Sequence, residues 1–239
     1  MMAGMVSAFP KSSADLMMPL LKIEDSGVPS PRWPSALPTM PSIMKVTKEQ
    51  SAANRQALVD AASKLYRERG IAGVGLAEIS REAGFTHGGF YGRFASKEEL
   101  AAEACDQAFE VSLSRLAAQL DKHDGDLGPF LKRYFSAAHR DAPGGGCPMA
   151  ALGVDAAREG GLLRESMSAG IGAYVHELAT HRPDGTVVET PTAEDEARAI
   201  GLLATMVGGL VLARACAGAA PGLSERILRT SLAASSKAA

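Results

Sequence analysis

The chain has few of the residues that mark disulfide-rich or metal-binding proteins. Only three of its 239 residues are cysteines, and Cys105, Cys147 and Cys216 lie far apart. Disulfide frameworks and zinc sites use an even set of closely spaced cysteines, so neither is expected here. The histidines outside the N-terminal half show no spacing with acidic or thiol partners that would suggest a metal site. We therefore expect a protein of the reducing cytoplasm, without a metal or a cofactor.

Long apolar runs are also absent. The longest extends from Ala199 to Ala213 and contains three glycines, and it is shorter than the ~20 residues of a membrane span. It is better interpreted as a buried or interface helix. The N-terminus lacks a basic start followed by an apolar stretch and a cleavage site, so no signal peptide and no membrane association are expected.

Neither sign of charge dominates the chain. The formal net charge of −2 excludes a wholly basic protein that coats nucleic acid. The distribution is uneven, however, because the stretch from Lys45 to Lys97 carries nine Lys and Arg against five Asp and Glu. A basic head on an acidic body favours a partner that carries phosphates.

Residues 1–43 differ from everything that follows. They contain seven prolines and show neither helical nor strand periodicity. Such a stretch buries too little apolar surface to offset its ordering entropy, so we expect an extension without fixed structure. We expect Met44 to be the natural start, with a genuine flexible tail as the alternative.

The pattern from Lys48 onwards is helical throughout. A stripe of apolar residues spaced three and four apart predicts an amphipathic first helix that ends at Gly70 (Leu58, Ala61, Ala62, Leu65, Tyr66). No sheet and no internal repeat are indicated, so the predicted fold class is all-α. Further helices are expected at about 76–83, 86–93, 96–120, 127–140, 148–159, 162–181, 193–217 and 222–236.

The second and third of these helices form the motif that carries function. The segment from Leu76 to Phe94 reads LAEISREAGFTHGGFYGRF, with a turn at Gly84 and with Phe85 suited to filling the junction. This spacing is that of a helix-turn-helix, whose second helix enters the major groove of DNA. Two adjacent glycines inside a helix cost about 1 kcal/mol each relative to alanine. That cost is reasonable where the helix must approach another surface closely, and the exposed face of the helix would carry Thr86, His87, Gly88 and Tyr91.

The start of the next helix gives a second indication of an anion partner. Ser96 and Glu99 have the spacing of a capping box. Lys97 is a cation in the first turn, where it opposes the helix dipole. It is reasonable there if the helix N-terminus and the lysine act on the same phosphate.

Residues 48–100 resemble the N-terminal domain of the TetR family of bacterial regulators. The similarity is carried by NRQALVDAASKLYRERGIAGVGLAEISREAGFTHGGFYGRFASKEEL, almost without a gap. The remaining helices fit the family's ligand-binding and dimerisation domain only in number and length. The resemblance implies a helix-turn-helix DNA-binding domain at 44–100 and a helical ligand-binding and dimerisation domain at 101–239.

The resemblance also implies roles for individual residues. His87 and Gly88 would contact base edges, and phosphate contacts would come from the remaining positions (Thr86, Tyr91, Arg93, Lys97 and, from the first helix, Arg55). The partner would be double-stranded operator DNA, with repression relieved by an unknown small-molecule effector. Helices 193–217 and 222–236 would form a homodimer, with Ala204, Gly208, Gly209 and Ala213 allowing close approach.

Cys147 leaves two alternatives open. It follows three glycines and precedes Pro148, so it is predicted to be the N-cap of a helix, where a thiol is more acidic and more reactive. One alternative is a redox- or electrophile-sensing regulator, and the competing interpretation is an ordinary cap. A thiol enzyme is much less favoured, because no motif fixes a base beside Cys147, and neither a Gly-rich phosphate loop nor a His-Glu-x-x-His motif is present.

Overall fold

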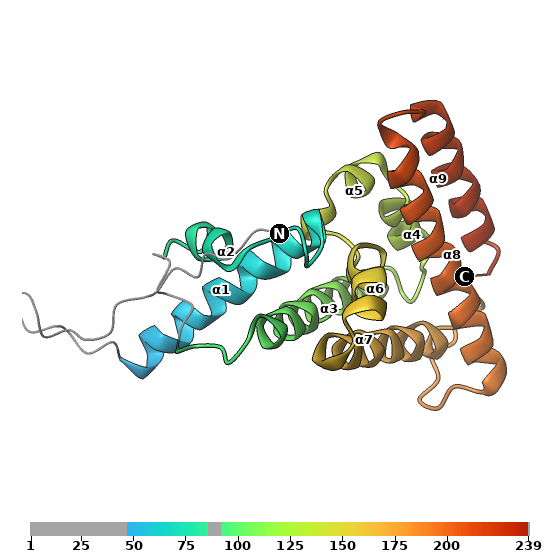
Figure 1. Ribbon diagram of the computed structural model, residues 1–239. Coiled ribbons are helices and arrows are strands. Elements are labelled where there is room, and N and C mark those ends of the chain that lie inside the picture. Colours follow the sequence, from blue (N-terminus) through green and yellow to red (C-terminus); the bar gives the residue numbers. More distant parts are fainter. Residues whose placement is uncertain (1–46, 86–91, 239) are drawn as a thin grey trace, which may run out of the picture. The chain divides into compact units, whose positions relative to one another are not determined.

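A computed structural model describes residues 47–85 and 92–238 of the chain (Figure 1). These residues belong to one unit that begins at Val46. The expected extension at 1–43 and the predicted DNA-reading residues at 86–91 lie outside the described residues.

The described residues are helical, as predicted. The helices are α1 (Lys48–Arg69), α2 (Leu76–Glu82), α3 (Lys97–Lys122), α4 (Gly128–Tyr134), α5 (Ala137–Asp141), α6 (Pro148–Glu159), α7 (Gly161–Thr180), α8 (Ala193–Ala217) and α9 (Pro221–Ser235), with a short 3₁₀ turn η2 (Pro143–Gly145). An isolated β-bridge joins His181 and Val187. The all-α fold class is confirmed.

One predicted helix is divided in two. The pattern at 127–140 predicts a single helix, but α4 ends at Tyr134 and α5 begins at Ala137. The Ser136 hydroxyl accepts a hydrogen bond from the backbone N–H of His139 at 3.1 Å, which makes Ser136 the N-cap of a new helix. The apolar periodicity continues across this break, and the sequence pattern alone therefore misses it.

The capping interactions explain where two long helices begin. At α3 the Ser96 hydroxyl accepts from the N–H of Glu99 at 3.0 Å, as predicted, but the Glu99 carboxylate accepts from Ala95 rather than from Ser96. At α8 the full reciprocal box is present between Thr192 and Asp195.

The first three helices pack as a head against a larger body. α1 packs against both α2 and α3. α3 continues from the head into the body, where it lies along α7 (Figure 1). The expected domain boundary at residue 100 falls inside α3, so the head and the body share that helix.

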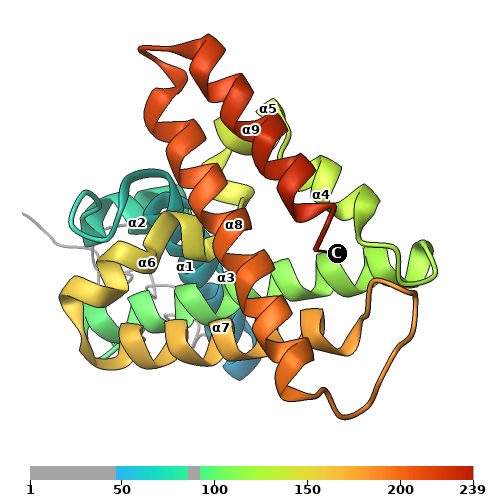
Figure 2. The ribbon, with the colours of Figure 1, turned by 90° about the vertical axis from the view of Figure 1, so that its right-hand side faces the viewer.

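α8 and α9 form the end of the chain as a helical pair. They pack side by side, and α8 also packs on α7 (Figures 1 and 2). Among the described helices, α8 is long and apolar enough to cross a membrane by length and composition. That test alone does not indicate a membrane protein, since core helices pass it too, and α8 carries three acidic residues in its first turn.

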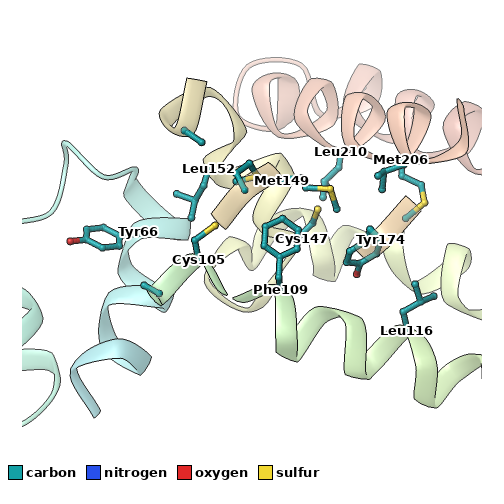
Figure 3. Packing of buried hydrophobic residues seen from close by; sticks show 14 of the residues in the cluster. Tyr66, Cys105, Phe109, Leu116, Cys147, Met149, Leu152, Tyr174, Met206 and Leu210 are labelled. Atoms are coloured by element: carbon teal, nitrogen blue, oxygen red, sulfur yellow. The ribbon is translucent and has the colours of Figure 1, made fainter. Parts of the chain in front are cut away.

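A continuous apolar core fills the space between α3, α6, α7 and α8. Phe109 and Tyr174 meet edge to face with ring centroids 6.3 Å apart. Figure 3 shows these two rings together with Cys147 and Met206 in the same stretch of the core. Cys147, the candidate reactive cysteine, therefore lies in the same core as residues of α3, α7 and α8.

Candidate functional site

The first half of the helix-turn-helix is built as the sequence predicts. α2 buries Ile79 and Ser80 against the head, and Gly84 follows it with φ 79°, a conformation that glycine adopts without strain. Phe85 is partly buried and packs on the core. The guanidinium of Arg93 lies over its ring, 5.6 Å from the centroid. The turn that follows α2 is therefore the one that the sequence predicts.

Lys97 lies at the start of α3. Its ammonium donates to the carbonyl of Ile71 at 2.8 Å and lies 5.9 Å from the centre of the Tyr66 ring. An ammonium has three donors, and this contact uses one of them. The remaining donors and the first amides of α3 suit a phosphate, which is the role predicted for Lys97.

Arg55 is held inside the head. Its guanidinium pairs with Glu103 and lies 3.4 Å from a Glu99 oxygen. It also stacks 4.4 Å from the centre of the Phe94 ring, and its Nε donates to the carbonyl of Arg93 at 3.3 Å. Hydrogen bonding to Glu103 raises the pKa of Arg55. Arg55 thus fixes the segment that follows the predicted DNA-reading helix, in addition to any phosphate contact.

A cavity of about 360 Å³ lies in the body, between α3, α4, α7 and the loop that precedes α6. This volume is within the range of small-molecule sites in proteins. Its wall combines aromatic rings with polar groups (Ser112, Arg115, Gln119, Phe130, Arg133, Tyr134, Ser136, Ala138, His139, Ala142, Gly145, Gly146, Cys147, Tyr174). No local sequence pattern brings this set together, because the residues come from segments up to 62 positions apart, as in the 2.6 Å hydrogen bond between Ser112 and Tyr174.

Cys147 is the N-cap of α6, with Pro148 at the first helical position, as predicted. Its side chain is buried, at 3% exposed, although the residue contributes to the cavity wall. Burial raises the pKa of the Cys147 thiol, and the neighbouring Tyr134 hydroxyl opposes this only in part. The N-cap position alone predicts the opposite direction, so burial outweighs the helix terminus here.

His139 comes close to Cys147 but does not activate its thiol. Its Nε2 accepts the backbone N–H of Cys147 at 3.2 Å, and its Nδ1 contacts the carbonyl of Tyr134 at 2.7 Å. Both ring nitrogens are therefore occupied by backbone groups. This arrangement positions the loop before α6, and it offers no base for a nucleophilic cysteine.

The described geometry defines a class of protein: a helical head, with the first helix and the turn of the predicted motif, joined through a shared helix to an all-helical body with a cavity of small-molecule size. Residues 58–104 match the family model described as "Bacterial regulatory proteins, tetR family". Over this segment the chain is therefore similar to the TetR family.

Individual relatives are consistent with this assignment. The HTH-type transcriptional regulator TtgR of Pseudomonas putida is 31% identical over 104 residues, which is 42% of this chain and 50% of TtgR. The chain thus spans about half the length of the curated relatives it matches.

The solved structures cover more of the fold. A TetR transcriptional regulator from Chloroflexus aurantiacus has a TM-score of 0.63 at 26% identity, over 79% of this chain and 95% of that one. The reduced form of Escherichia coli NemR has a TM-score of 0.62 at 22% identity, over 76% of this chain and 95% of NemR. At that identity the similarity to NemR shows the fold alone.

Proposed function

We propose that the chain is a transcriptional regulator that binds operator DNA through the segment from Thr86 to Lys97. The family match over residues 58–104 carries this proposal. The turn at Gly84 and the position of Lys97 at the N-terminus of α3 support it. His87 and Gly88 would contact base edges, while Thr86, Tyr91, Arg93, Lys97 and Arg55 would contact phosphates; these assignments remain predictions.

The experiment is fluorescence anisotropy of the full chain on labelled DNA from beside its own gene and on scrambled DNA, across a salt series. An operator-reading protein binds the first DNA selectively and loses affinity steeply as salt rises. Lys97→Gln should weaken binding to all DNAs and lower the salt slope by about 1, as expected for the loss of one phosphate contact. Lys122→Gln at the other end of α3 is the matched control and should change neither. Equal, weak binding to both DNAs would contradict the proposal for this operator.

We further propose that DNA binding represses transcription and that a small molecule in the cavity relieves the repression. The supporting observation is that α1 and α3 both contact the loop that forms part of the cavity wall. Arg67 of α1 donates to the carbonyl of Gly146 at 2.9 Å, and Arg115 of α3 donates to that of Gly145 at 2.7 Å. A ligand that displaces this loop would change the position of the head. A small change in the separation of two heads is enough to break their register on half-sites about 34–36 Å apart.

The second candidate is a thiol-sensing regulator that uses Cys147. The buried thiol and its raised pKa weigh against this candidate, since the thiolate is the reactive form. The test treats the DNA complex with hydrogen peroxide or N-ethylmaleimide. If the wild type and Cys216→Ser release DNA but Cys147→Ser does not, the thiol mechanism replaces the ligand mechanism; release from all three would exclude Cys147 as the sensor.

A further inference from the structure

The cavity in the body has a one-sided charge. Its wall contains two arginines and a histidine, and none of its lining residues is an Asp or Glu. Arg115 and Arg133 are exposed, so the cavity reaches the surface beside them. A wall with positive groups and no carboxylate of its own raises the local concentration of anions.

Two further arginines lie just behind this wall. Arg67 donates to the carbonyl of Gly146, and Arg214 donates to the carbonyls of Arg140 and His139 at 3.1 and 3.2 Å. Across residues 47–85 and 92–238, neither forms an ion pair, and the same holds for Arg115 and Arg133. Burial lowers the pKa of both Arg67 and Arg214, and Arg115 lowers that of Arg67 further. The structure thus keeps several positive charges close together, with backbone carbonyls as their hydrogen-bond partners, and the Glu68 carboxylate offsets Arg67 only in part.

A hydroxyl group on the cavity wall lacks a nitrogen or oxygen partner. Tyr134 lines the cavity and is only 6% exposed, and its hydroxyl has no nitrogen or oxygen partner among the described residues. Its hydrogen-bonding neighbour is the thiol of Cys147, a weak acceptor, so a ligand oxygen that accepts its proton would be favoured. The hydroxyl of Tyr174, by contrast, is already paired with Ser112.

We propose that the effector is a small aromatic carboxylate, bound with its anionic group toward Arg115, Arg133 and Tyr134. This inference rests on the proposed function and names the chemistry of its ligand. The planar guanidinium groups match the two oxygens of a carboxylate, and the Tyr134 hydroxyl adds a neutral donor. The rings of Phe130 and Tyr174 on the same wall suit an aromatic body. A cationic ligand would face the positive groups, and a neutral ligand would leave them uncompensated.

The experiment is isothermal titration calorimetry of the full chain, without DNA, with benzoate and 2-naphthoate and with their neutral amides, benzamide and 2-naphthamide. Each acid and its amide have nearly the same shape, so the comparison isolates the charge. We expect at least one acid to bind about tenfold or more tightly than its amide, since hydrogen bonds to charged groups are the stronger ones. The double variant Arg115→Gln/Arg133→Gln should remove this preference. Tyr134→Phe should weaken the acid severalfold and the amide less, because a charged acceptor forms the stronger hydrogen bond.

Arg158→Gln is the matched control, because Arg158 is an exposed arginine of α6 outside the cavity wall. It should retain the preference for the acid. Amides that bind as tightly as acids, an equal loss in Arg158→Gln, or no binding of either acid up to millimolar concentration would each overturn the inference. The calorimetry and the DNA experiment test different proposals. If the protein binds its operator selectively but binds no acid, only the proposed ligand class is wrong. If it binds an acid but no operator, the proposed regulatory function is wrong.

Discussion

His139 is held as a neutral imidazole by its two backbone contacts. The N–H of Cys147 points at Nε2, so the ring proton lies on Nδ1 and points at the carbonyl of Tyr134. Burial lowers the pKa of His139 below its ordinary value. The surrounding arginines of α3, α4 and α8, namely Arg115, Arg133 and Arg214, lower it further.

A pH dependence of stability follows from this environment. The unfolded chain takes up a proton at His139 as the pH falls through 6.5, while the folded chain resists it. The contribution of His139 is therefore fully present above that pH and is lost as the pH falls below it. Urea unfolding should show a lower free energy of unfolding at about pH 5.5 than at about pH 7.5. His139→Gln, which can keep both hydrogen bonds but cannot titrate, should reduce the difference; an unchanged difference would assign it to other groups.

Arg55 is expected to stabilise the head through Glu103. Arg55→Gln should lower the free energy of unfolding by about 1 kcal/mol, a modest value because the pair is partly exposed. Glu103→Gln breaks the same ion pair but keeps the Arg55 cation. Comparing the two variants therefore separates the stabilising role of Arg55 from its predicted phosphate contact. If both variants weaken operator binding equally and keep the salt slope, the effect comes from the fold of the head. A slope lowered only in Arg55→Gln would establish the phosphate contact that the family resemblance implies.

Sequence patterns at the residue scale predict local features better than burial. The N-cap position of Cys147 follows from the glycines and the proline around it, and it is confirmed. Its burial depends on residues distant in sequence, such as Tyr134 and Arg214, which no local pattern reveals. The partner of Arg55 at position 103 is hidden for the same reason, since 48 positions separate the two.

At the scale of helices, α3 and α7 lie close together at Gly170. A Cβ added there would overlap the ring of Phe109, whereas a Cβ at Gly172, two residues further along α7, would meet nothing within 4 Å. Gly170→Ala should therefore destabilise the protein by about 1–3 kcal/mol through overpacking. Gly172→Ala should be neutral or stabilise by up to about 1 kcal/mol through helix propensity. Thermal unfolding of the two variants tests this, and equal midpoints would show that the core around Phe109 can adjust.

The loop between α5 and α6 connects the cavity to the head. Arg67 of α1 reaches the carbonyl of Gly146, and Gly144 packs so closely against Glu68 that a Cβ there would overlap its carboxylate. We expect Arg67→Met to uncouple the two sites. Binding of 2-naphthoate should be nearly unchanged, but the ligand should no longer lower the operator affinity in an anisotropy titration. Arg69→Met is the control, because Arg69 lies on the same helix and pairs with Glu78 of the head. Loss of ligand binding in Arg67→Met would instead place Arg67 in the site itself.

The ends of most helices could be predicted from the sequence, because glycine, proline and capping residues act locally. α6 and α8 begin and end at the predicted residues. The cavity could not be predicted, since it requires α3, α4 and α7 to be brought together by packing. Its charge was hidden for the same reason, as the arginines on its wall and behind it come from four different helices.

At the scale of the molecule, the small residues of α8 divide between two faces. Gly209 and Ala213 face the chain's own α9, where a Cβ at Gly209 would overlap Ser231 and the carbonyl of Ala213 accepts from Ser224 at 2.7 Å. Ala204 and Gly208 are less buried and remain available to a partner. The sequence predicts that all four small residues allow close packing between two copies. Two of them instead allow close packing of α8 against α9 within one chain.

The exposed apolar residues of α8 are where we expect a second copy to pack. Val211 and Leu212 are 42% and 57% exposed, and together with Ile200 they give α8 an apolar face that residues 47–85 and 92–238 leave uncovered. Replacing Val211 and Leu212 by aspartate would bury charge in a dimer interface, so sedimentation velocity should show monomers where the wild type shows dimers. Operator affinity should fall as well, because two half-sites are then bound independently. Val154→Asp on α6, at 61% exposed, is the control and should remain dimeric. If the α8 variant also remains dimeric, the chains associate through another surface, and the separation of the DNA-binding heads must be set there.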